Sequence, residues 1–586
     1  MDEKTGAQIF VEALKREGVE IIFGYPGAAV IYIYDELFDS DIKTILPHHE
    51  QGGVHAADGY ARSTGKVGVC MATSGPGATN LVTGLATAYM DSVGIVAFTG
   101  QVPTSMIGTD GFQEIDIKGI STPITKHNYL VEDVRELPRI IKEAFHLAGT
   151  GRPGPVLVDI PKNVQQDTTN FYYPETVDIQ GYNPVYESND LQVKEAAEFI
   201  NNSKRPLIYA GGGVNIAEAS EELTKLAHKA SIPVTTTLTA IGCFDEYDEL
   251  SLGMPGMHGT SQANLAFTKT DLVIALGARF DDRVTGNVES FAPGANIIHV
   301  DIDSAELDKI IETDIAIEGD VKSFLESLNP LIDENAHEQW LKQIEEWKLI
   351  DDYKAMKDDA VSPRIILEEL DNLTDGNVLL TTEVGQHQMW AAKFFNFSRP
   401  RSLITSGGLG TMGYGFPAAL GVKAGNPDKE VVCIAGDGSM QMNIQELATA
   451  AKNNLSVTIL IFNNQYLGMV RQWQELFLDS RYASTCLRKR DECPRNCKGP
   501  ESEAALKECP EFIPDFIQVA RGYGIRGEKV INKEGIRPAL KKALATEGPY
   551  IVDFRIEREE NVFPMVPAGG SLDEMILSDE DEFKLL

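Results

Sequence analysis

Short apolar runs alternate with amphipathic helical stretches along most of the chain, and this alternation restricts the fold more than any other feature. A helix is predicted over residues 7–17, and buried strands are predicted at 19–23, 67–73 and 156–160. Strands that alternate with helices are typical of parallel sheets with helices on both faces. We therefore predict an α/β fold.

The same pattern starts again twice, which predicts three domains. The later strands are expected at 206–210, 234–237, 272–275 and 297–301, and then at 378–382, 431–435, 457–462 and 550–554. A polar, turn-rich stretch over 178–190 and a charged helical stretch over 335–357 separate the units. The expected domains are residues 1–180, 188–345 and 360–586.

Composition and charge narrow the classes of partner. The 586 residues carry a net charge of −35, which opposes binding to nucleic acid or to anionic membranes. No apolar run approaches the roughly 18–20 residues of a membrane span. The first residues lack the basic and apolar regions of a secretory signal, so we expect a cytoplasmic protein with no membrane partner.

The most specific motif lies behind two of the predicted strands. Gly436-Asp437-Gly438-Ser439 follows the strand at 431–435, and Asn463-Asn464 follows the strand at 457–462. Glycines allow a backbone to approach a diphosphate closely, while carboxylate and amide oxygens suit Mg²⁺. The alternative is a pair of unrelated strand-end turns. We predict a diphosphate–Mg²⁺ site whose metal-binding residues are Asp437, Asn464 and Tyr466.

This spacing is the fingerprint of thiamine diphosphate enzymes, and around it the chain resembles the catalytic subunit of the biosynthetic acetohydroxyacid (acetolactate) synthases. The resemblance extends from residues 22–28 to residues 563–567. It implies N- and C-terminal thiamine diphosphate-binding domains around a central FAD-binding domain. It also implies decarboxylation of pyruvate and transfer of the hydroxyethyl group to a second pyruvate or to 2-ketobutyrate, the first common step of branched-chain amino-acid biosynthesis.

A second motif, His49-Glu50-Gln51-Gly52-Gly53, contributes a carboxylate. Thiamine catalysis needs an acid at N1′ of the aminopyrimidine, so that the 4′-imine can take the proton from C2. The resemblance gives this role to Glu50, although an exposed Glu at a helix start is the alternative. It further implies that Glu50 reaches the cofactor of a partner subunit, and therefore a homodimer or homotetramer with the active site across the dimer interface.

A glycine-rich loop at 407–413 precedes an Ala-rich helix. Gly408, Gly410 and Gly413 formally match the dinucleotide motif GxGxxG, which on its own is weak support for a Rossmann site. In the resembling family this loop cradles thiamine diphosphate, with the residue at Met412 supporting its bent shape. The expected cofactor-binding residues are Pro26, Gly27, Gln386, His387, Gly410, Thr411, Met412, Gly438 and Ser439.

The run Arg279-Phe280-Asp281-Asp282-Arg283 resembles the flavin-binding signature that separates the biosynthetic synthases from the flavin-free catabolic ones. Glycines admit a pyrophosphate, and a strand-end carboxylate can bind ribose or adenine. The alternative is an α/β domain with an empty or altered pocket. The residues expected to bind FAD are Arg152, Gly212, Gly256, His258, Gly277, Arg279 and Asp301.

Further matches concern the substrates. The resemblance assigns Trp473 to the preference for 2-ketobutyrate and Arg283 to the carboxylate of the acceptor. It assigns Gln113, near the reacting centre, and Lys162, in the access channel, to the catalytic residues, and it assigns Phe112 to the substrate site. Trp473 as an ordinary core residue and Lys162 as a solvated lysine are the structural alternatives.

One segment departs from the family. Residues 486–510 carry Cys486, Cys493, Cys497 and Cys509 in the pattern C-x6-C-x3-C-x11-C, with several Arg and Lys residues among them. Four thiolates can hold Zn²⁺ or an iron–sulfur cluster, but this spacing fits no standard motif. Disulfides, a redox switch or unmodified thiols are the other interpretations. The remaining cysteines, Cys70, Cys243 and Cys433, are expected in the core.

Other functions remain open at this point. The chain could be another thiamine enzyme, such as pyruvate oxidase, sulfoacetaldehyde acetyltransferase or catabolic acetolactate synthase. It could be a non-catalytic relative that senses keto acids, or a Rossmann dehydrogenase. Within the favoured interpretation, the resemblance also implies a separate small regulatory subunit.

Overall fold

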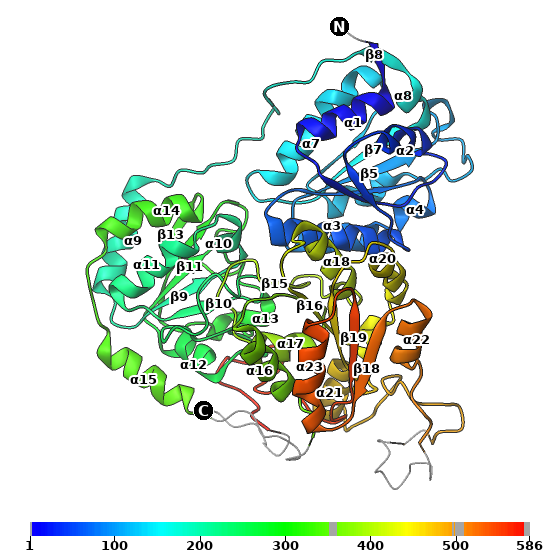
Figure 1. Cartoon of the computed structure of the whole chain (residues 1–586). Coiled ribbons are helices and arrows are strands. Elements are labelled where there is room, and N and C mark those ends of the chain that lie inside the picture. The colour runs from blue at the N-terminus through cyan, green and yellow to red at the C-terminus, as the bar shows by residue number, and fades with distance from the viewer. Residues whose placement is uncertain (1–2, 351–359, 495–496, 498–508, 579–586) are drawn as a thin grey trace.

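The computed structural model describes residues 3–350, 360–494, 497 and 509–578. Three α/β units are visible in Figure 1, with the N-terminal unit at the top, the central unit to the left and the C-terminal unit below. Each contains one parallel sheet between helices, so the predicted α/β fold with three parallel sheets is confirmed. No helix among these residues is both long enough and apolar enough to cross a bilayer.

The N-terminal unit holds a six-stranded sheet in the order β3-β2-β4-β5-β7-β6. Its strands are β2 (Ile21–Gly24), β3 (Lys43–Ile45), β4 (Gly68–Ala72), β5 (Ile95–Gln101), β6 (His127–Leu130) and β7 (Val156–Pro161). Its helices are α1 (Gly6–Arg16), α2 (Ile31–Phe38), α3 (Glu50–Thr64), α4 (Pro76–Thr79), α5 (Val82–Met90), α6 (Ile117–Ser121), α7 (Leu137–Gly149) and α8 (Lys162–Gln166). Strands β1 (Glu3–Thr5) and β8 (Thr168–Asn170) form a separate antiparallel pair.

The central unit holds a five-stranded sheet in the order β10-β9-β11-β12-β13. Its strands are β9 (Pro206–Ala210), β10 (Val234–Thr236), β11 (Leu272–Leu276), β12 (Asn296–Asp301) and β13 (Ile315–Glu318). Its helices are α9 (Asp190–Asn202), α10 (Gly212–Ile216), α11 (Ser220–Ala230), α12 (Ser261–Lys269), α13 (Asp282–Thr285), α14 (Val321–Leu328) and α15 (Glu338–Lys348). Part of the charged stretch predicted at 335–357 lies outside the described residues.

The C-terminal unit holds a six-stranded sheet in the order β15-β14-β16-β17-β19-β18. Its strands are β14 (Leu379–Thr382), β15 (Leu403–Ile404), β16 (Val431–Gly436), β17 (Thr458–Phe462), β18 (Arg526–Val530) and β19 (Tyr550–Phe554). Its helices are α16 (Pro363–Thr374), α17 (Gln386–Phe394), α18 (Gly415–Gly425), α19 (Asp437–Met440), α20 (Leu447–Lys452), α21 (Gly468–Phe477), α22 (Phe516–Gly522) and α23 (Ile536–Leu544), with a 3₁₀ turn at Ile444–Glu446. The segment after β19 returns to the central unit, where Val566 N–H donates to the Met257 carbonyl at 2.8 Å.

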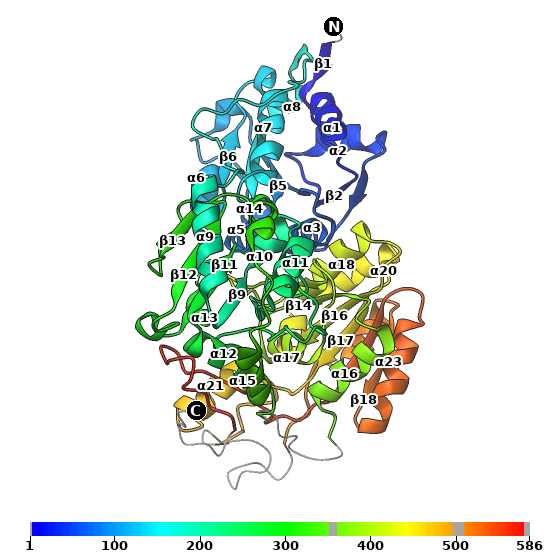
Figure 2. The ribbon, with the colours of Figure 1, turned by 90° about the vertical axis from the view of Figure 1, so that its left-hand side faces the viewer.

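The N- and C-terminal sheets have the same strand order and meet through one helix from each unit. Helices α3 and α18 lie side by side in both Figure 1 and Figure 2. A Cβ atom on Gly59 would lie 2.2 Å from the Ala418 carbonyl oxygen, and one on Gly421 would lie 1.7 Å from the Ala56 carbonyl oxygen. These two contacts are reciprocal, because Gly59 corresponds to Gly421 and Ala56 to Ala418 at the same separation along the chain. The two units are therefore related by a local twofold.

This close contact between the helices is possible because Gly59 and Gly421 have no side chain. We predict that Gly421→Ala lowers the thermal unfolding midpoint, because the new methyl group must push the two helices apart, at a cost of about 1–3 kcal/mol or more. Gly522→Ala, in α22, is the matched control, because a Cβ atom there has no heavy-atom neighbour within 4 Å. Equal midpoints for the two variants would show that α3 and α18 are not in this close contact.

Candidate functional site

The loops after β16 and β17 bring together the residues of the predicted metal site. Gly436 and Phe462 are paired at the ends of these neighbouring parallel strands, so the chain leaves the sheet at the same edge in both places. The Asp437 carboxylate accepts the Gln465 N–H at 2.8 Å, and Asn464 Oδ1 accepts the Tyr466 N–H at 3.1 Å. Asp437, Asn464 and Tyr466 are all buried.

Burial makes Asp437 a much weaker acid than an ordinary aspartate. Its enclosure by protein raises the pKa to about 8, because a buried carboxylate lacks the solvation that favours its charged form. A bound cation would offset that cost, and a carboxylate with an amide oxygen fits Mg²⁺. No group of three or more His, Cys, Asp or Glu that could hold a metal ion occurs in the described part of the chain.

Two predicted residues stand next to this loop at the start of α17. Gln386 accepts from Asn464 Nδ2 at 3.2 Å and donates to Gln472 Oε1 at 3.0 Å. His387 packs so closely on Gly436 that a Cβ atom there would lie 3.0 Å from its ring. Burial lowers the pKa of His387 to about 3, so the ring is neutral, and its Nε2 atom is buried without a hydrogen-bond partner. Such an atom fits a site that is completed by a bound polar group.

The glycine-rich loop passes beside the same site. Gly410 has a φ of +70°, a backbone conformation that favours glycine. Thr411 is buried, with its hydroxyl 2.7 Å from the Thr87 hydroxyl of the N-terminal unit. The Met412 methyl group lies 3.8 Å from the position of a Cβ atom on Gly438, and Ser439 is buried in the first turn of α19. The predicted residues of this loop and of α19 therefore share one region of the C-terminal unit.

Glu50 is the first residue of α3, which begins there because the His49 ring accepts the Gln51 N–H. The Glu50 side chain is half-buried and accepts from Asn80 Nδ2 at 2.9 Å. It also lies close to Gly77, since a Cβ atom there would be 3.3 Å from Glu50 Oε1. Both contacts belong to the N-terminal unit.

The other predicted residues of the N-terminal unit lie in its loops. Gln113 has a φ of +60° and packs against Gly75, whereas Phe112 is 88% exposed. Lys162 Nζ lies 5.7 Å from the centre of the Tyr32 ring. The remaining two residues form the turn after β2, where Pro26 is exposed and Gly27 packs on Thr73.

A cavity of about 720 Å³ lies where the three units meet. Its wall includes most of the residues predicted to bind FAD, namely Arg152, Gly212, His258, Gly277, Arg279 and Asp301. It also includes Gly410 and the predicted substrate residues Arg283 and Trp473. Its volume lies in the range of about 300–1,000 Å³ that is usual for ligand pockets. Glycine is required in the wall, because a Cβ atom on Gly213 would lie 2.7 Å from the Gly277 Cα atom.

The wall of this cavity contains both an ion-paired arginine and buried titratable groups. Arg152 pairs with Asp303 at 2.9 Å and with Glu306 at 2.6 Å. Burial raises the pKa of Asp301 to about 6 and lowers that of His258 to about 4. The His258 Nδ1 atom is buried without a partner. The described lining includes Pro255 and Met257 but not Gly256, which has a φ of +103° and where a Cβ atom would lie 2.3 Å from the Arg283 carbonyl oxygen.

Two of the three predicted substrate residues, Arg283 and Trp473, lie at the same cavity, whereas Phe112 does not line it. The Arg283 side chain is 62% exposed, and its guanidinium lies 3.2 Å from the Asp282 carboxylate. Trp473 is half-buried in α21 and contacts Phe477, with 5.3 Å between ring centres. The indole is therefore neither an ordinary core residue nor fully exposed.

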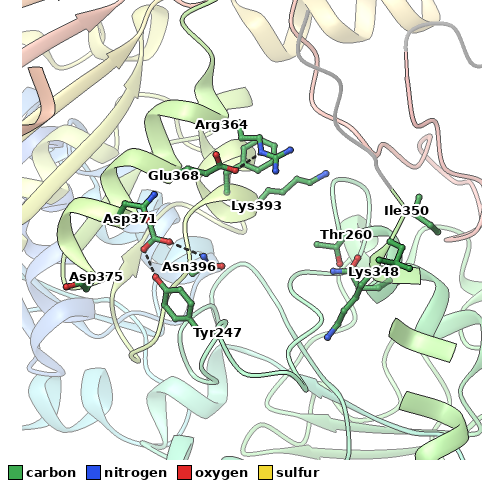
Figure 3. A pocket seen from close by; sticks show the side chains of 14 residues that line it. Tyr247, Thr260, Lys348, Ile350, Arg364, Glu368, Asp371, Asp375, Lys393 and Asn396 are labelled. Atoms are coloured by element: carbon green, nitrogen blue, oxygen red, sulfur yellow. Dashed lines mark hydrogen bonds and ion pairs between the residues drawn. The ribbon is translucent and has the colours of Figure 1, made fainter. Parts of the chain in front are cut away.

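A second cavity, of about 990 Å³, lies between the central and C-terminal units. In Figure 3 its side chains pair with one another: Asp371 accepts from the Tyr247 hydroxyl at 2.6 Å and from Asn396 Nδ2 at 3.0 Å. None of the described residues in its wall was predicted as a site residue. We therefore place the candidate site at the first cavity and the nearby loops.

The cysteine-rich segment is only partly described, since residues 495–496 and 498–508 lie outside the described part. The Arg488 guanidinium donates to the Cys509 carbonyl at 3.0 Å, and the Arg490 guanidinium donates to the Glu511 carbonyl at 3.1 Å. These two arginines therefore donate to backbone carbonyl oxygens. The four cysteines are partly exposed, and the described residues provide no three-ligand metal group there. By contrast, Cys70, Cys243 and Cys433 are buried, as predicted.

Two buried carboxylates that the sequence analysis missed connect the N- and C-terminal units. Asp91, at the end of α5, accepts the Gly407 N–H at 2.9 Å, the Gly408 N–H at 2.6 Å and the Arg62 guanidinium at 2.8 Å. Glu446 accepts the His48 N–H at 3.0 Å. Neither lies in a recognisable motif, so only the packing of the two units reveals them.

Comparison with known families assigns three parts of the chain. Three parts of a thiamine pyrophosphate enzyme match in order: the N-terminal TPP binding domain over residues 4–120, the central domain over 193–328 and the C-terminal TPP binding domain over 383–554.

Curated proteins match over nearly the full length. The chain is 47% identical to a probable acetolactate synthase large subunit of Methanocaldococcus jannaschii, over 97% of this chain and 95% of that protein. It is 46% identical to the acetolactate synthase large subunit of Corynebacterium glutamicum, over 97% and 90%. It is 45% identical to the chloroplastic acetolactate synthase of Arabidopsis thaliana, over 99% and 86%.

Because Asp91 shares the Arg62 guanidinium with Asp58 and also accepts two N–H groups, Asp91→Asn should destabilise the interface between the two units by about 1–3 kcal/mol. We expect a lower urea midpoint for this variant. The control is Asp39→Asn, which makes the same change at the exposed end of α2. Identical midpoints would contradict the assigned role of Asp91.

Proposed function

The chain belongs to the acetolactate synthases of the thiamine pyrophosphate enzyme family, and on that premise we propose its reaction. It decarboxylates pyruvate and joins the remaining two-carbon unit to a second pyruvate or to 2-ketobutyrate. The observation that carries this proposal is 47% identity, over 97% of the chain, to a probable acetolactate synthase large subunit. The step is the first common one in branched-chain amino-acid biosynthesis.

The cofactor supplies the electron chemistry: bound thiamine diphosphate provides a thiazolium that accepts electrons as a 2-keto acid loses carbon dioxide. The chain supplies proton transfer and orientation. Glu50 would hold a proton at N1′ of the aminopyrimidine, and its hydrogen bond from Asn80 fixes the direction of the carboxyl group. Gly410, Thr411 and Met412 would support the cofactor.

Asp437, Asn464 and Tyr466 would hold Mg²⁺, which neutralises the diphosphate. The buried Asp437 carboxylate and the adjacent amide oxygen support this assignment, because both are hard oxygen donors. The partnerless Nε2 atom of His387 supports a polar ligand beside Gly436.

FAD would occupy the cavity at the meeting point of the three units. The support is its volume of about 720 Å³, its glycine wall and its Arg152, Arg279 and Asp301 side chains. Pyruvate condensation needs no net electron transfer, so FAD would act there by filling and bracing the wall. The residues involved would include Gly212, Gly277 and His258.

The acceptor keto acid would bind beside the same cavity. Arg283 would pair with its carboxylate, since an exposed guanidinium is available there. Trp473 would pack on the extra methyl group of 2-ketobutyrate, which is worth about 1–3 kcal/mol, a preference rather than an absolute choice. Gln113, Phe112 and Lys162 would line the approach from the loops of an N-terminal unit.

We further propose a homodimer, in which Glu50 of one subunit serves the C-terminal unit of the other. The support is that the described hydrogen bond of the Glu50 carboxylate comes from Asn80 of its own unit, so the C-terminal unit of the same chain does not hold this carboxylate. Several relatives carry the name large subunit, which supports a separate small regulatory partner. The cytoplasmic location and any Zn²⁺ or iron–sulfur site at the cysteines stay predictions.

Glu50→Gln tests the acid directly. We expect turnover to fall by about 100- to 10,000-fold, the usual contribution of a general acid–base group, with an unchanged thermal midpoint. Glu132→Gln, an exposed residue of the same unit, should retain full activity. Turnover of Glu50→Gln near that of the unaltered protein would remove Glu50 from the mechanism.

Asp437→Asn tests the metal site. Loss of the buried negative charge should weaken Mg²⁺ binding by at least about tenfold, measured by calorimetry in the presence of thiamine diphosphate. Asp428→Asn changes an exposed carboxylate in the same unit and should leave binding unaltered. Unchanged Mg²⁺ affinity in Asp437→Asn would place the metal elsewhere.

A further inference from the structure

Glu446 reaches across the interface between the N- and C-terminal units. It closes the 3₁₀ turn before α20, and its side chain is only 1% exposed. Its two oxygens accept the His48 N–H at 3.0 and 3.1 Å, and one of them also accepts the Thr449 hydroxyl at 2.7 Å. A carboxylate of the C-terminal unit is therefore bound to the backbone of the N-terminal unit.

The point of attachment lies directly before the helix that carries Glu50. His48 precedes Glu50 by two residues, and its Nδ1 atom lies 3.0 Å from the Thr449 hydroxyl. On the other side, Glu446 packs on the first turn of α3, where a Cβ atom on Gly52 would lie 2.6 Å from Glu446 Oε1. The loop before Glu50 and the turn after it thus contact the same carboxylate.

The local twofold repeats this arrangement in the opposite direction. From the N-terminal unit, Thr87 and Asp91 of the α5 region hold the loop before α18, through Thr411 and through the N–H groups of Gly407 and Gly408. Thr87 and Thr449 are separated along the chain by the same number of residues as Gly59 and Gly421. Each unit therefore forms hydrogen bonds to the loop before α3 or α18 of the other unit.

We propose that Glu446 is a positioning residue for Glu50, an inference that rests on the proposed function of Glu50. Glu446 touches no reacting atom. It holds the N-terminal end of α3 so that the Glu50 carboxyl group keeps one direction. A general acid must be held within hydrogen-bond reach of its proton acceptor, so movement of this end of the helix slows proton transfer.

The first test needs no cofactor. Glu446→Gln keeps the size of the side chain but loses at least one acceptor, and Glu338→Gln at the exposed start of α15 is its control. We expect faster amide hydrogen exchange over residues 46–53 in Glu446→Gln, by about tenfold, because the His48 N–H loses an acceptor. Exchange equal to that of the control would overturn the inference.

The second test reads the chemistry of Glu50. Exchange of the C2 proton of bound thiamine diphosphate in D₂O should slow by about tenfold in Glu446→Gln, while the affinity for the cofactor stays within about threefold. In Glu50→Gln/Glu446→Gln, exchange should be no slower than in Glu50→Gln alone, because both changes act on one carboxyl group. Additive losses would show that Glu446 does not act through Glu50 and would overturn the inference.

Gly52→Ala perturbs the same contact from the side of α3, and it changes neither Glu50 nor Glu446. Alanine favours a helix, so slower C2 exchange in this variant would come from displacement of Glu446. Wild-type C2 exchange in both Gly52→Ala and Glu446→Gln, with slow exchange in Glu50→Gln, would overturn this inference alone. Wild-type exchange in Glu50→Gln would overturn the role of Glu50 itself, and the inference with it.

Discussion

The close packing of α3 on α18 is the contact on which the rest of the structure depends. At Gly59 and Gly421 the backbones approach so closely that no side chain fits between them. The contact relates the N- and C-terminal sheets by a local twofold. It thereby fixes the positions in space of the N-terminal ends of α3 and α18. Glu50 begins one helix and Met412 lies just before the other, so two residues to which we assign roles at the cofactor depend on the same interface.

The two related units have diverged in what their strand-end loops carry. In the C-terminal unit the loops after β16 and β17 present Asp437 and Asn464, which suit a metal and a diphosphate. In the N-terminal unit the loop after β3 leads to Glu50, which suits proton transfer. The central unit adds a glycine-walled cavity next to Gly410. Proton transfer, metal binding and cavity filling are thus assigned to separate units, and in the proposed dimer Glu50 acts on the C-terminal unit of the partner subunit.

Sequence reasoning reached part of this arrangement. Asp437 and Asn464 could be predicted to meet because each follows an apolar strand, and the carboxyl ends of neighbouring parallel strands share one edge. The cavity residues followed from resemblance to a known signature. Glu446 and Asp91 could not be predicted, because their role arises from contacts between distant units and no local pattern marks them. Gly256 was expected to bind FAD, whereas the described lining of the cavity includes its neighbours Pro255 and Met257 instead.

The central claim is a thiamine-dependent condensation of two keto acids, and product formation from pyruvate tests it most directly. Purified protein would be supplied with pyruvate, thiamine diphosphate and Mg²⁺, with and without FAD, and the products identified. We predict 2-acetolactate, formed only when thiamine diphosphate is present and dependent on FAD. Acetyl phosphate, acetaldehyde or no product would contradict the reaction, and acetolactate without any need for FAD would contradict the role given to the central cavity.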